Sequence, residues 1–230
     1  MADIKTLYSE RYAKQTVEHV YPVEFVVRAF LGSYPDLKLN RGDYAGRSVL
    51  DLGFGDGRNM PLLRNLGFNI HGVEIHEEIV KVALDRIAPL GIKADLKVGS
   101  NLKIPFEVEF FDYVLACHSC YYIEEGTTFK DNLREIHRVM KKDGVFICSL
   151  PMRDTYVLKG AEPSPAGKGH WKIKHDPYGL RAGTVFRAFE TENEVSEELG
   201  PFFGEARIGF CDDFYWGIRQ KVWIVVCKKL

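Results

Sequence analysis

The sequence predicts an α/β protein in which a doubly wound, mostly parallel sheet carries helices on both faces. Between residues 47 and 151, apolar runs typical of strands alternate with helical patterns, which is the arrangement of βαβ units. A glycine-rich turn joins the first of these runs to the helix that follows it. Two more apolar runs near the C-terminus are separated by a short connection, which favours antiparallel pairing.

The elements of this sheet follow one another regularly along the chain. We expect strands at 47–54, 68–75, 94–100, 110–117 and 144–151. Helices are expected between them, where apolar residues recur at helical spacing and a glycine follows, at 60–67, 77–91 and 129–144. The two C-terminal strands are expected at 205–216 and 220–229.

The segments outside this unit predict a single domain with additions. Residues 1–45 are expected to form a mostly helical cap, with one helix at 21–32. The cofactor-binding core is expected at 46–150, an insertion on the acceptor side at 151–205, and a strand pair at 206–230. Within the insertion, residues 191–200 are typical of a helix with a capping box.

Composition narrows the class of protein. A chain of 230 residues with 46% hydrophobic residues can bury a sizeable core. The formal net charge of −1 gives no sign of an overall electrostatic field that would attract nucleic acid or a membrane surface. The polar N-terminus and the lack of a run near the roughly 20 apolar residues of a membrane span favour a cytoplasmic protein, with no membrane partner.

The motif Cys117-His118-Ser119-Cys120 raises the question of metal or redox chemistry. A structural zinc site needs about four ligands, and the sequence has no second closely spaced pair of the usual kind. The total of five cysteines is odd, which favours reduced thiols packed as small hydrophobic side chains. We therefore expect no metal here.

The most informative stretch is VLDLGFGDGRN at 49–59, where a strand runs into Gly53, Gly55 and Gly57. Glycines at such a turn let a ligand approach the main chain closely. Glu74 ends the next strand, where an acid can bind a ribose hydroxyl pair. The spacing is G-x-G-x-G, with Asp51 two residues before the first glycine. An acid repels a pyrophosphate but attracts an ammonium or a sulfonium, so the loop favours S-adenosylmethionine over NAD.

With these residues, the chain resembles a class I S-adenosylmethionine-dependent methyltransferase of the small-molecule, ubiquinone-biosynthesis type. The resemblance covers residues 46–150 and, in outline, the last 25 residues. It includes VLDLGFGDG, GVEI, GSNLKIPF (99–106), FDYVLACHSCYYI and LREIHRVMKKDGVFICSLP. The chain departs from the family pattern at two places. Ser100 stands where the family has an acid on the adenine side, and residues 142–144 stand where it usually has proline-glycine.

The resemblance implies a Rossmann-like seven-stranded sheet with its last strand antiparallel, and S-adenosylmethionine as cofactor, with S-adenosylhomocysteine as product. It also implies a set of cofactor-binding positions. These are Asp51, Gly53, Gly55, Gly57, Glu74, Ile75, Ser100, Asn101 and Cys117.

The acceptor side is expected at the carboxyl end of the fourth strand and in the insertion. Methyl transfer from an activated sulfonium needs mainly positioning, and His118 is the candidate for a base or for a group that orients the acceptor, or else caps the strand end. Aromatic and charged residues could bind the acceptor, or could simply pack or face solvent. The candidates are Tyr12, Ser119, Tyr121, His170, Trp171, His175, Tyr178 and Arg181.

The expected activity is therefore O- or N-methylation of a small molecule. The alternatives are a non-catalytic protein that binds S-adenosylmethionine and, against the charge argument, an NAD-dependent oxidoreductase. No nucleic-acid partner is expected, and the chain is expected to be a monomer or a homodimer.

Overall fold

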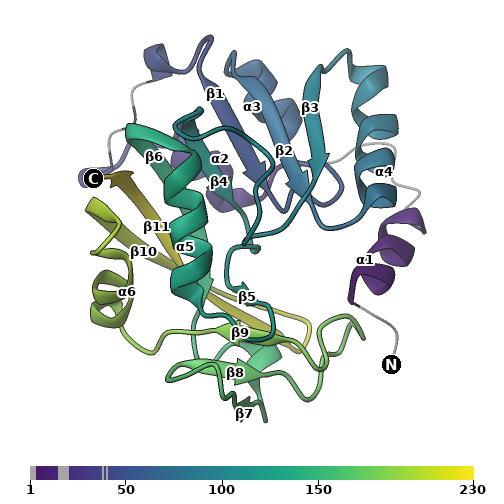
Figure 1. Cartoon of the computed structure of the whole chain (residues 1–230), viewed down its shortest axis with the longest axis vertical. Helices are drawn as coiled ribbons and strands as arrows, with labels where there is room; N and C mark the ends of the chain where they lie inside the picture. Colours follow the sequence, from purple (N-terminus) through teal and green to yellow (C-terminus); the bar gives the residue numbers. More distant parts are fainter. Residues whose placement is uncertain (1–3, 15–20, 38, 40) are drawn as a thin grey trace.

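The computed structural model describes residues 4–14, 21–37, 39 and 41–230, and the structural statements below concern these residues. A seven-stranded sheet crosses the molecule in the order β10-β11-β6-β4-β1-β2-β3 (Figure 1). Its strands are β1 (Ser48–Leu52), β2 (Asn69–Glu74), β3 (Ala94–Val98), β4 (Phe111–Ala116), β6 (Met140–Pro151), β10 (Phe203–Tyr215) and β11 (Ile218–Lys229).

The direction of the strands confirms the predicted doubly wound sheet. β1 pairs in parallel with both β2 and β4, and β4 pairs in parallel with β6. β11 is antiparallel to both β6 and β10, so the last strand runs against the others, as predicted. The strand order reverses between β4 and β1, and ligands of open α/β sheets bind at such a point.

Helices cover both faces of this sheet with separate apolar cores. On one face lie α5 (Phe129–Val139) and α6 (Glu192–Leu199), which pack with Leu50, Phe146 and their neighbours. The other face is covered by α2 (Glu24–Leu31), α3 (Met60–Asn65) and α4 (Glu77–Ile87). α1 (Ile4–Ala13) lies near the start of α4, at the end of the sheet where β1 and β2 finish (Figure 1). The short 3₁₀ helices are η1 (Arg41–Asp43), η2 (Ala88–Leu90) and η3 (Tyr156–Leu158).

The predicted helix at 129–144 is too long. α5 ends at Val139, and Met140 already pairs with Phe111 as the first residue of β6. Lys141 binds Asp112 at 2.8 Å, and Asp143, with φ +60°, lies in an irregularity of β6 between the residues that pair with Phe111 and Tyr113. Tertiary pairing with β4 therefore overrides the helical periodicity of the last turn.

The insertion contains structure that its composition did not predict. Its strands β7 (Glu162–Pro163), β8 (His170–Lys172) and β9 (Val185–Arg187) join β5 (Tyr122–Ile123) in a second, four-stranded sheet. β5 comes directly after the end of β4 and pairs with β9. The second sheet is thereby attached to the carboxyl end of the main sheet, at the bottom of Figure 1.

The described part of the N-terminal segment contains two α-helices, and α2 confirms the helix predicted at 21–32. Residues 32–37 contain no helix. Residues 1–3, 15–20, 38 and 40 of the predicted cap lie outside the described residues. The boundaries proposed for the four parts of the chain stay predictions.

Candidate active site

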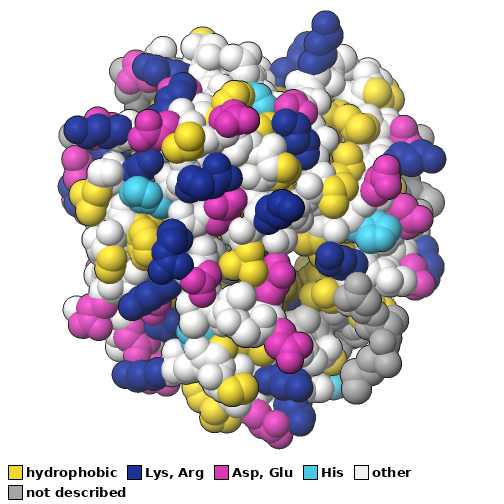
Figure 2. Space-filling model, in the orientation of Figure 1, with side chains coloured by type: hydrophobic (Ala, Val, Ile, Leu, Met, Phe, Trp, Pro, Cys, Tyr) yellow, Lys and Arg dark blue, Asp and Glu magenta, His cyan; other side chains and the backbone are white. Residues whose placement is uncertain are grey.

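A large cavity of about 1410 Å³ lies at the carboxyl ends of the parallel strands. Its lining comes from the loops after β1, β2 and β4, from α1, and from the second sheet. Figure 2 shows a hollow in the face of the molecule turned toward the viewer, bordered by hydrophobic and charged side chains. The sheet thus brings together segments that are far apart in the sequence, as the fold predicts.

The glycine loop forms one wall of the cavity and is closely packed. Gly53 and Gly55 have φ values of +70° and +56°, in the left-handed region that favours glycine. A side chain at Gly53 would overlap with Ser119, and one at Gly55 would overlap with the ring of Tyr12. The loop is therefore covered on one side by the end of β4 and on the other by α1.

Glu74 holds this loop at the end of β2. Its carboxylate accepts hydrogen bonds from the backbone N–H groups of Gly55 (2.9 Å) and Ile75 (2.7 Å). Burial raises the pKa of Glu74, although the two hydrogen bonds oppose this shift. Glu74 and Ile75 both line the cavity, where the carboxylate can accept hydrogen bonds from ribose hydroxyls.

Asp51 is a buried carboxylate without a hydrogen-bond partner among the described residues. Burial raises its pKa to about 7. The nearby Asn59 side chain opposes this shift, although it makes no hydrogen bond of normal geometry to Asp51, and the carboxylates of Glu74 and Asp56 add to it. Asp56 is itself neutralised by ion pairs with Arg58 (3.0 Å) and Arg86 (3.1 Å). An unpartnered acid under the loop fits a cationic ligand such as the ammonium or sulfonium of S-adenosylmethionine.

The remaining predicted cofactor positions divide into two groups. Cys117, Ser100 and Asn101 line the cavity, and the Asn101 amide donates to the carbonyl oxygen of Ser119 (3.0 Å), which fixes Asn101 against the end of β4. Asp51 and Gly57 are absent from the lining, and Gly57 has φ +76° in the loop behind it.

His118 lines the cavity in an unusual conformation. Its φ is +58°, its backbone N–H donates to Ser149 Oγ (2.9 Å), and its Nδ1 lies 2.9 Å from the same oxygen. Burial, and after it the positive charges of Arg181 and Arg58, lower the pKa of His118 to about 4. This pKa lies below the near-neutral value expected of a general base, so the imidazole is unprotonated at pH 7 but only weakly basic.

The hydrogen bonds of Ser149 indicate which nitrogen of His118 carries the proton. Ser149 is fully buried, and its described partners are the N–H and the Nδ1 of His118. Its own hydroxyl proton is satisfied if it donates to Nδ1, which leaves the other ring proton on Nε2. We assign this tautomer on that basis, so the neutral ring offers an N–H donor to the cavity.

Among the predicted acceptor-side residues, Tyr12, Ser119, Tyr121, Tyr178 and Arg181 line the cavity. The other three predicted positions lie outside its lining. His170 is buried beneath α5, where its Nε2 accepts from the backbone N–H of Phe129 (3.3 Å). Trp171 stacks under Arg153 at 3.8 Å, and His175 is exposed. These three side chains have structural or solvent-facing positions.

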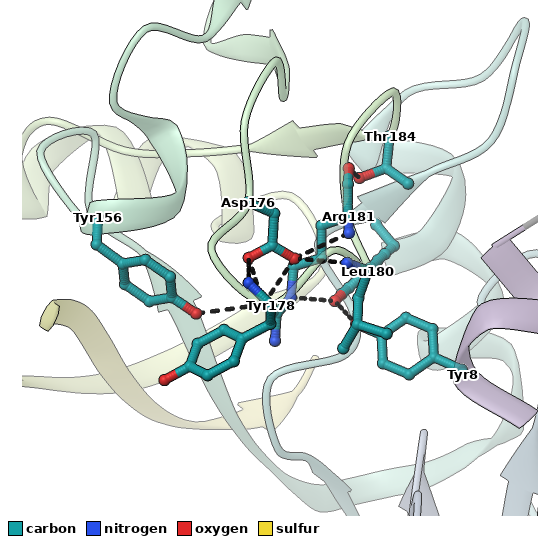
Figure 3. Close-up of polar contacts among 8 residues, drawn as sticks. Tyr8, Tyr156, Asp176, Tyr178, Leu180, Arg181 and Thr184 are labelled. Atoms are coloured by element: carbon teal, nitrogen blue, oxygen red, sulfur yellow. Dashed lines mark hydrogen bonds and ion pairs between the residues drawn. The ribbon is translucent and has the colours of Figure 1, made fainter. Parts of the chain in front are cut away.

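Arg181 is the centre of a polar network that joins the second sheet to α1 (Figure 3). Its Nε donates to the Tyr122 hydroxyl (3.3 Å), which lies 2.6 Å from the Tyr8 hydroxyl of α1. Its Nη1 donates to Tyr156 (3.2 Å) and pairs with Asp176 (3.3 Å).

Tyr156 and Ser149 were not predicted as site residues, because nothing local in the sequence distinguishes them from core residues.

In the part of the chain that the structure describes, no three His, Cys, Asp or Glu side chains gather in a way that could hold a metal ion. Among the helices described, none has both the length and the apolar character needed to cross a membrane.

Residues 50–148 match the family described as Methyltransferase domain. YdaC of Bacillus subtilis, named an uncharacterized methyltransferase, is 30% identical over 120 residues, which cover 51% of this chain and 61% of that protein. A Mycolicibacterium smegmatis protein, named "Probable S-adenosylmethionine-dependent methyltransferase", is 26% identical over 161 residues, or 70% of this chain and 57% of that protein. The chain thus spans less than two thirds of the length of these curated relatives.

The crystal structure of a SAM-dependent methyltransferase from Methanosarcina mazei has the same fold. It superimposes with a TM-score of 0.63 over 92% of this chain and 99% of that one, at 16% sequence identity. S-adenosylmethionine is the cofactor of these enzymes, and the glycine loop, Glu74 and the unpartnered Asp51 fit it. Residues 50–148 thus resemble a methyltransferase domain, and the chain has the fold of an S-adenosylmethionine-dependent methyltransferase.

Proposed function

We propose that this chain transfers a methyl group to an oxygen or nitrogen atom of a small-molecule acceptor by in-line displacement. The observation that carries the proposal is one continuous cavity with two unlike walls. The glycine loop and Glu74 form the wall suited to the cofactor. Tyr121, Tyr122 and Phe186 form a second, aromatic part of the lining, which we assign to the acceptor.

The size of the cavity supports a second ligand beside the cofactor. Pockets for a single small ligand commonly enclose about 300–1,000 Å³, and this cavity has about 1410 Å³. Its far wall is built from aromatic rings, with Phe186 at 4.3 Å from Tyr122 and 4.8 Å from Tyr121 between centroids. Such a wall suits a compact organic acceptor rather than an extended polymer.

The chemistry needs little from the protein beyond geometry. When bound, S-adenosylmethionine supplies a methyl group on a sulfonium, which leaves as a neutral thioether. The protein aligns the acceptor atom with that methyl and excludes water. The Tyr8–Tyr122 contact helps by joining α1 to the second sheet across the cavity.

In this proposal His118 orients the acceptor. Its neutral ring donates a hydrogen bond through Nε2, because Nδ1 is engaged by Ser149. A pKa of about 4 makes the imidazole a weak base at neutral pH. Acceptor atoms that react without losing a proton in the transfer step, such as a neutral amine or an ionised oxygen, suit this site.

The test is a two-stage measurement on the purified chain. Calorimetry with S-adenosylhomocysteine and with NAD comes first, and we expect binding of the former alone. A screen for S-adenosylhomocysteine production over small metabolites follows, with RNA and a protein mixture as macromolecular acceptors. Turnover confined to macromolecules would contradict a small-molecule acceptor, and cofactor binding without any turnover would favour a non-catalytic binding protein.

A further inference from the structure

Arg181 places a cation in the wall of the cavity, against the hydroxyl groups of Tyr122 and Tyr156. Its side chain is 21% exposed and lines the cavity, while the carboxylate of its partner Asp176 is fully buried. The sequence between them, from 177 to 180, forms a tight turn held by Asp176 (Figure 3). The guanidinium is therefore held in place by the turn rather than free to move on the surface.

Asp176 is already satisfied by the backbone of this turn. Its oxygens accept from the N–H groups of Tyr178 (3.1 Å), Leu180 (3.0 Å) and Arg181 (2.9 Å). Its ion pair with the Arg181 guanidinium is long, at 3.3 Å for both oxygens. The carboxylate of Asp176 thus positions Arg181 and leaves part of the hydrogen-bonding capacity of the guanidinium unused.

Several donors of this cluster remain available to a ligand. Among the described residues, Nε of Arg181 donates to Tyr122 and Nη1 to Tyr156 and Asp176, whereas Nη2 has no acceptor. Tyr156 accepts from Arg181, so its own O–H is free to donate. The two N–H groups of Nη2 and the hydroxyl of Tyr156, whose oxygen lies 3.2 Å from Nη1, therefore belong to one cluster in the cavity lining.

We infer that Arg181, with Tyr156, binds a carboxylate of the acceptor and so makes this enzyme selective for small carboxylic acids. The inference rests on the function proposed above and names the class of its substrate. A guanidinium with free N–H groups and a tyrosine hydroxyl is a donor set that matches carboxylate oxygens. The surrounding rings of Tyr121, Tyr122 and Phe186 would pack against the body of the same molecule.

The charge of the cluster favours a carboxylate over a phosphate. Asp176 offsets the charge of Arg181, and Arg11, which lies 5.4 Å from the centre of the Tyr178 ring, adds one positive charge. A singly charged carboxylate balances this cluster, whereas a dianionic phosphate would leave an excess of negative charge in a partly buried site. Arg181 also lies close enough to His118 for its charge to lower the pKa of that ring. A carboxylate held at Arg181 would therefore place the rest of the acceptor near the end of β4.

The experiment measures binding to the chain saturated with S-adenosylhomocysteine. The carboxylate probes are acetate, benzoate, phenylacetate and 3-phenylpropionate, and benzamide and phenyl phosphate are the comparison ligands. The variants are Arg181→Met, Tyr156→Phe and, as a matched control, Lys172→Met, which removes another cation from the cavity lining. Affinity for S-adenosylhomocysteine reports whether each variant is folded.

We expect the wild type to bind at least one carboxylate and to bind benzamide and phenyl phosphate more weakly. Loss of charge-assisted hydrogen bonds in Arg181→Met should weaken that binding by roughly 10- to 100-fold. Tyr156→Phe should weaken it by about 3- to 10-fold, and Lys172→Met by less than about twofold. In all three variants, affinity for S-adenosylhomocysteine should stay at the wild-type value.

Three outcomes would overturn the inference: no binding of any carboxylate by the wild type, equal binding by Arg181→Met, or preference for phenyl phosphate. Each of these leaves the proposed methyl transfer standing if S-adenosylhomocysteine still binds. Failure of the wild type to bind S-adenosylhomocysteine would instead overturn the proposed function, and the inference with it. If Arg181→Met were unfolded, an unchanged carboxylate affinity in Tyr156→Phe would count against the subsite.

Discussion

The carboxylate of Glu74 accepts a hydrogen bond of 2.9 Å from the backbone N–H of Gly55. This contact joins the end of β2 to the glycine loop that follows β1. The second carboxylate oxygen of Glu74 accepts a hydrogen bond of 2.7 Å from the backbone N–H of Ile75. The residue suited to bind the cofactor's ribose therefore also positions the loop beside it, so that loop and ribose site are built as one unit.

Replacement of Glu74 by alanine should weaken binding of S-adenosylhomocysteine by at least about 10- to 100-fold, because charge-assisted hydrogen bonds are lost. Calorimetry on the purified variant measures this directly. Glu125→Ala is the matched control, since Glu125 also lines the cavity but is exposed at its edge. Equal affinity in the two variants would place the ribose elsewhere.

Gly55→Val should abolish detectable cofactor binding. Valine is strained at φ +56°, and its side chain would overlap with Tyr12. Gly46→Val separates these two causes, because Gly46 has φ +77° with open space around it and lies outside the cavity lining. We expect Gly46→Val to lose stability and still bind S-adenosylhomocysteine. Cofactor binding by Gly55→Val at wild-type affinity would show that the loop is not the binding wall.

Asp51→Asn should stabilise the cofactor-free chain in a pH-dependent way. Burial raises the pKa of Asp51 to about 7, so between about pH 4 and 7 the folded chain holds a proton that the unfolded chain has lost. Wild-type stability therefore falls as the pH rises through this window. The variant should gain roughly 1–3 kcal/mol above pH 7 and almost nothing below pH 4. Urea unfolding at pH 4, 6 and 8 measures the difference.

The same substitution should weaken binding of S-adenosylmethionine, because a negative charge that attracts the cationic ligand is removed. The loss should be larger for S-adenosylmethionine than for S-adenosylhomocysteine, whose sulfur carries no charge. A variant that is destabilised at pH 8, or one that binds both ligands as the wild type does, would contradict the role given to Asp51.

His118→Ala should lower kcat by about 10- to 100-fold on the acceptor found by the screen and leave cofactor affinity within about twofold. His118→Gln should recover part of the rate, since its amide can donate a hydrogen bond as Nε2 does. The wild-type pH–rate profile should show no inflection from this group between pH 6 and 8, because the pKa of His118 is about 4. A neutral inflection that disappears in His118→Ala would show general-base catalysis instead.

Local sequence signals were sufficient for the main sheet and the cofactor wall. A strand that enters three glycines, and an acid at the end of the next strand, predict the loop and Glu74 because parallel strands end at the same edge of a sheet. The helix boundary at Val139 was missed because pairing of Met140 with Phe111 depends on residues distant in sequence. Helical spacing alone cannot detect that competition.

The acceptor wall was only partly predictable. Aromatic and charged residues of the insertion were identified as a group, but their spacing does not say which face of a short strand meets the cavity. Arg181, in the loop between β8 and β9, lines the cavity, whereas His170 on β8 lies beneath the start of α5. Tyr156 and Ser149 act through partners 25 and 31 residues away, which no local pattern reveals.

A crystal structure with S-adenosylhomocysteine bound tests the central claim most directly. We predict that the ribose hydroxyls bind Glu74, that the sulfur faces His118 at the end of β4, and that open volume continues from the sulfur toward Arg181. A ligand bound outside the glycine loop, or a sulfur enclosed by protein with no space on the side of Arg181, would contradict the account.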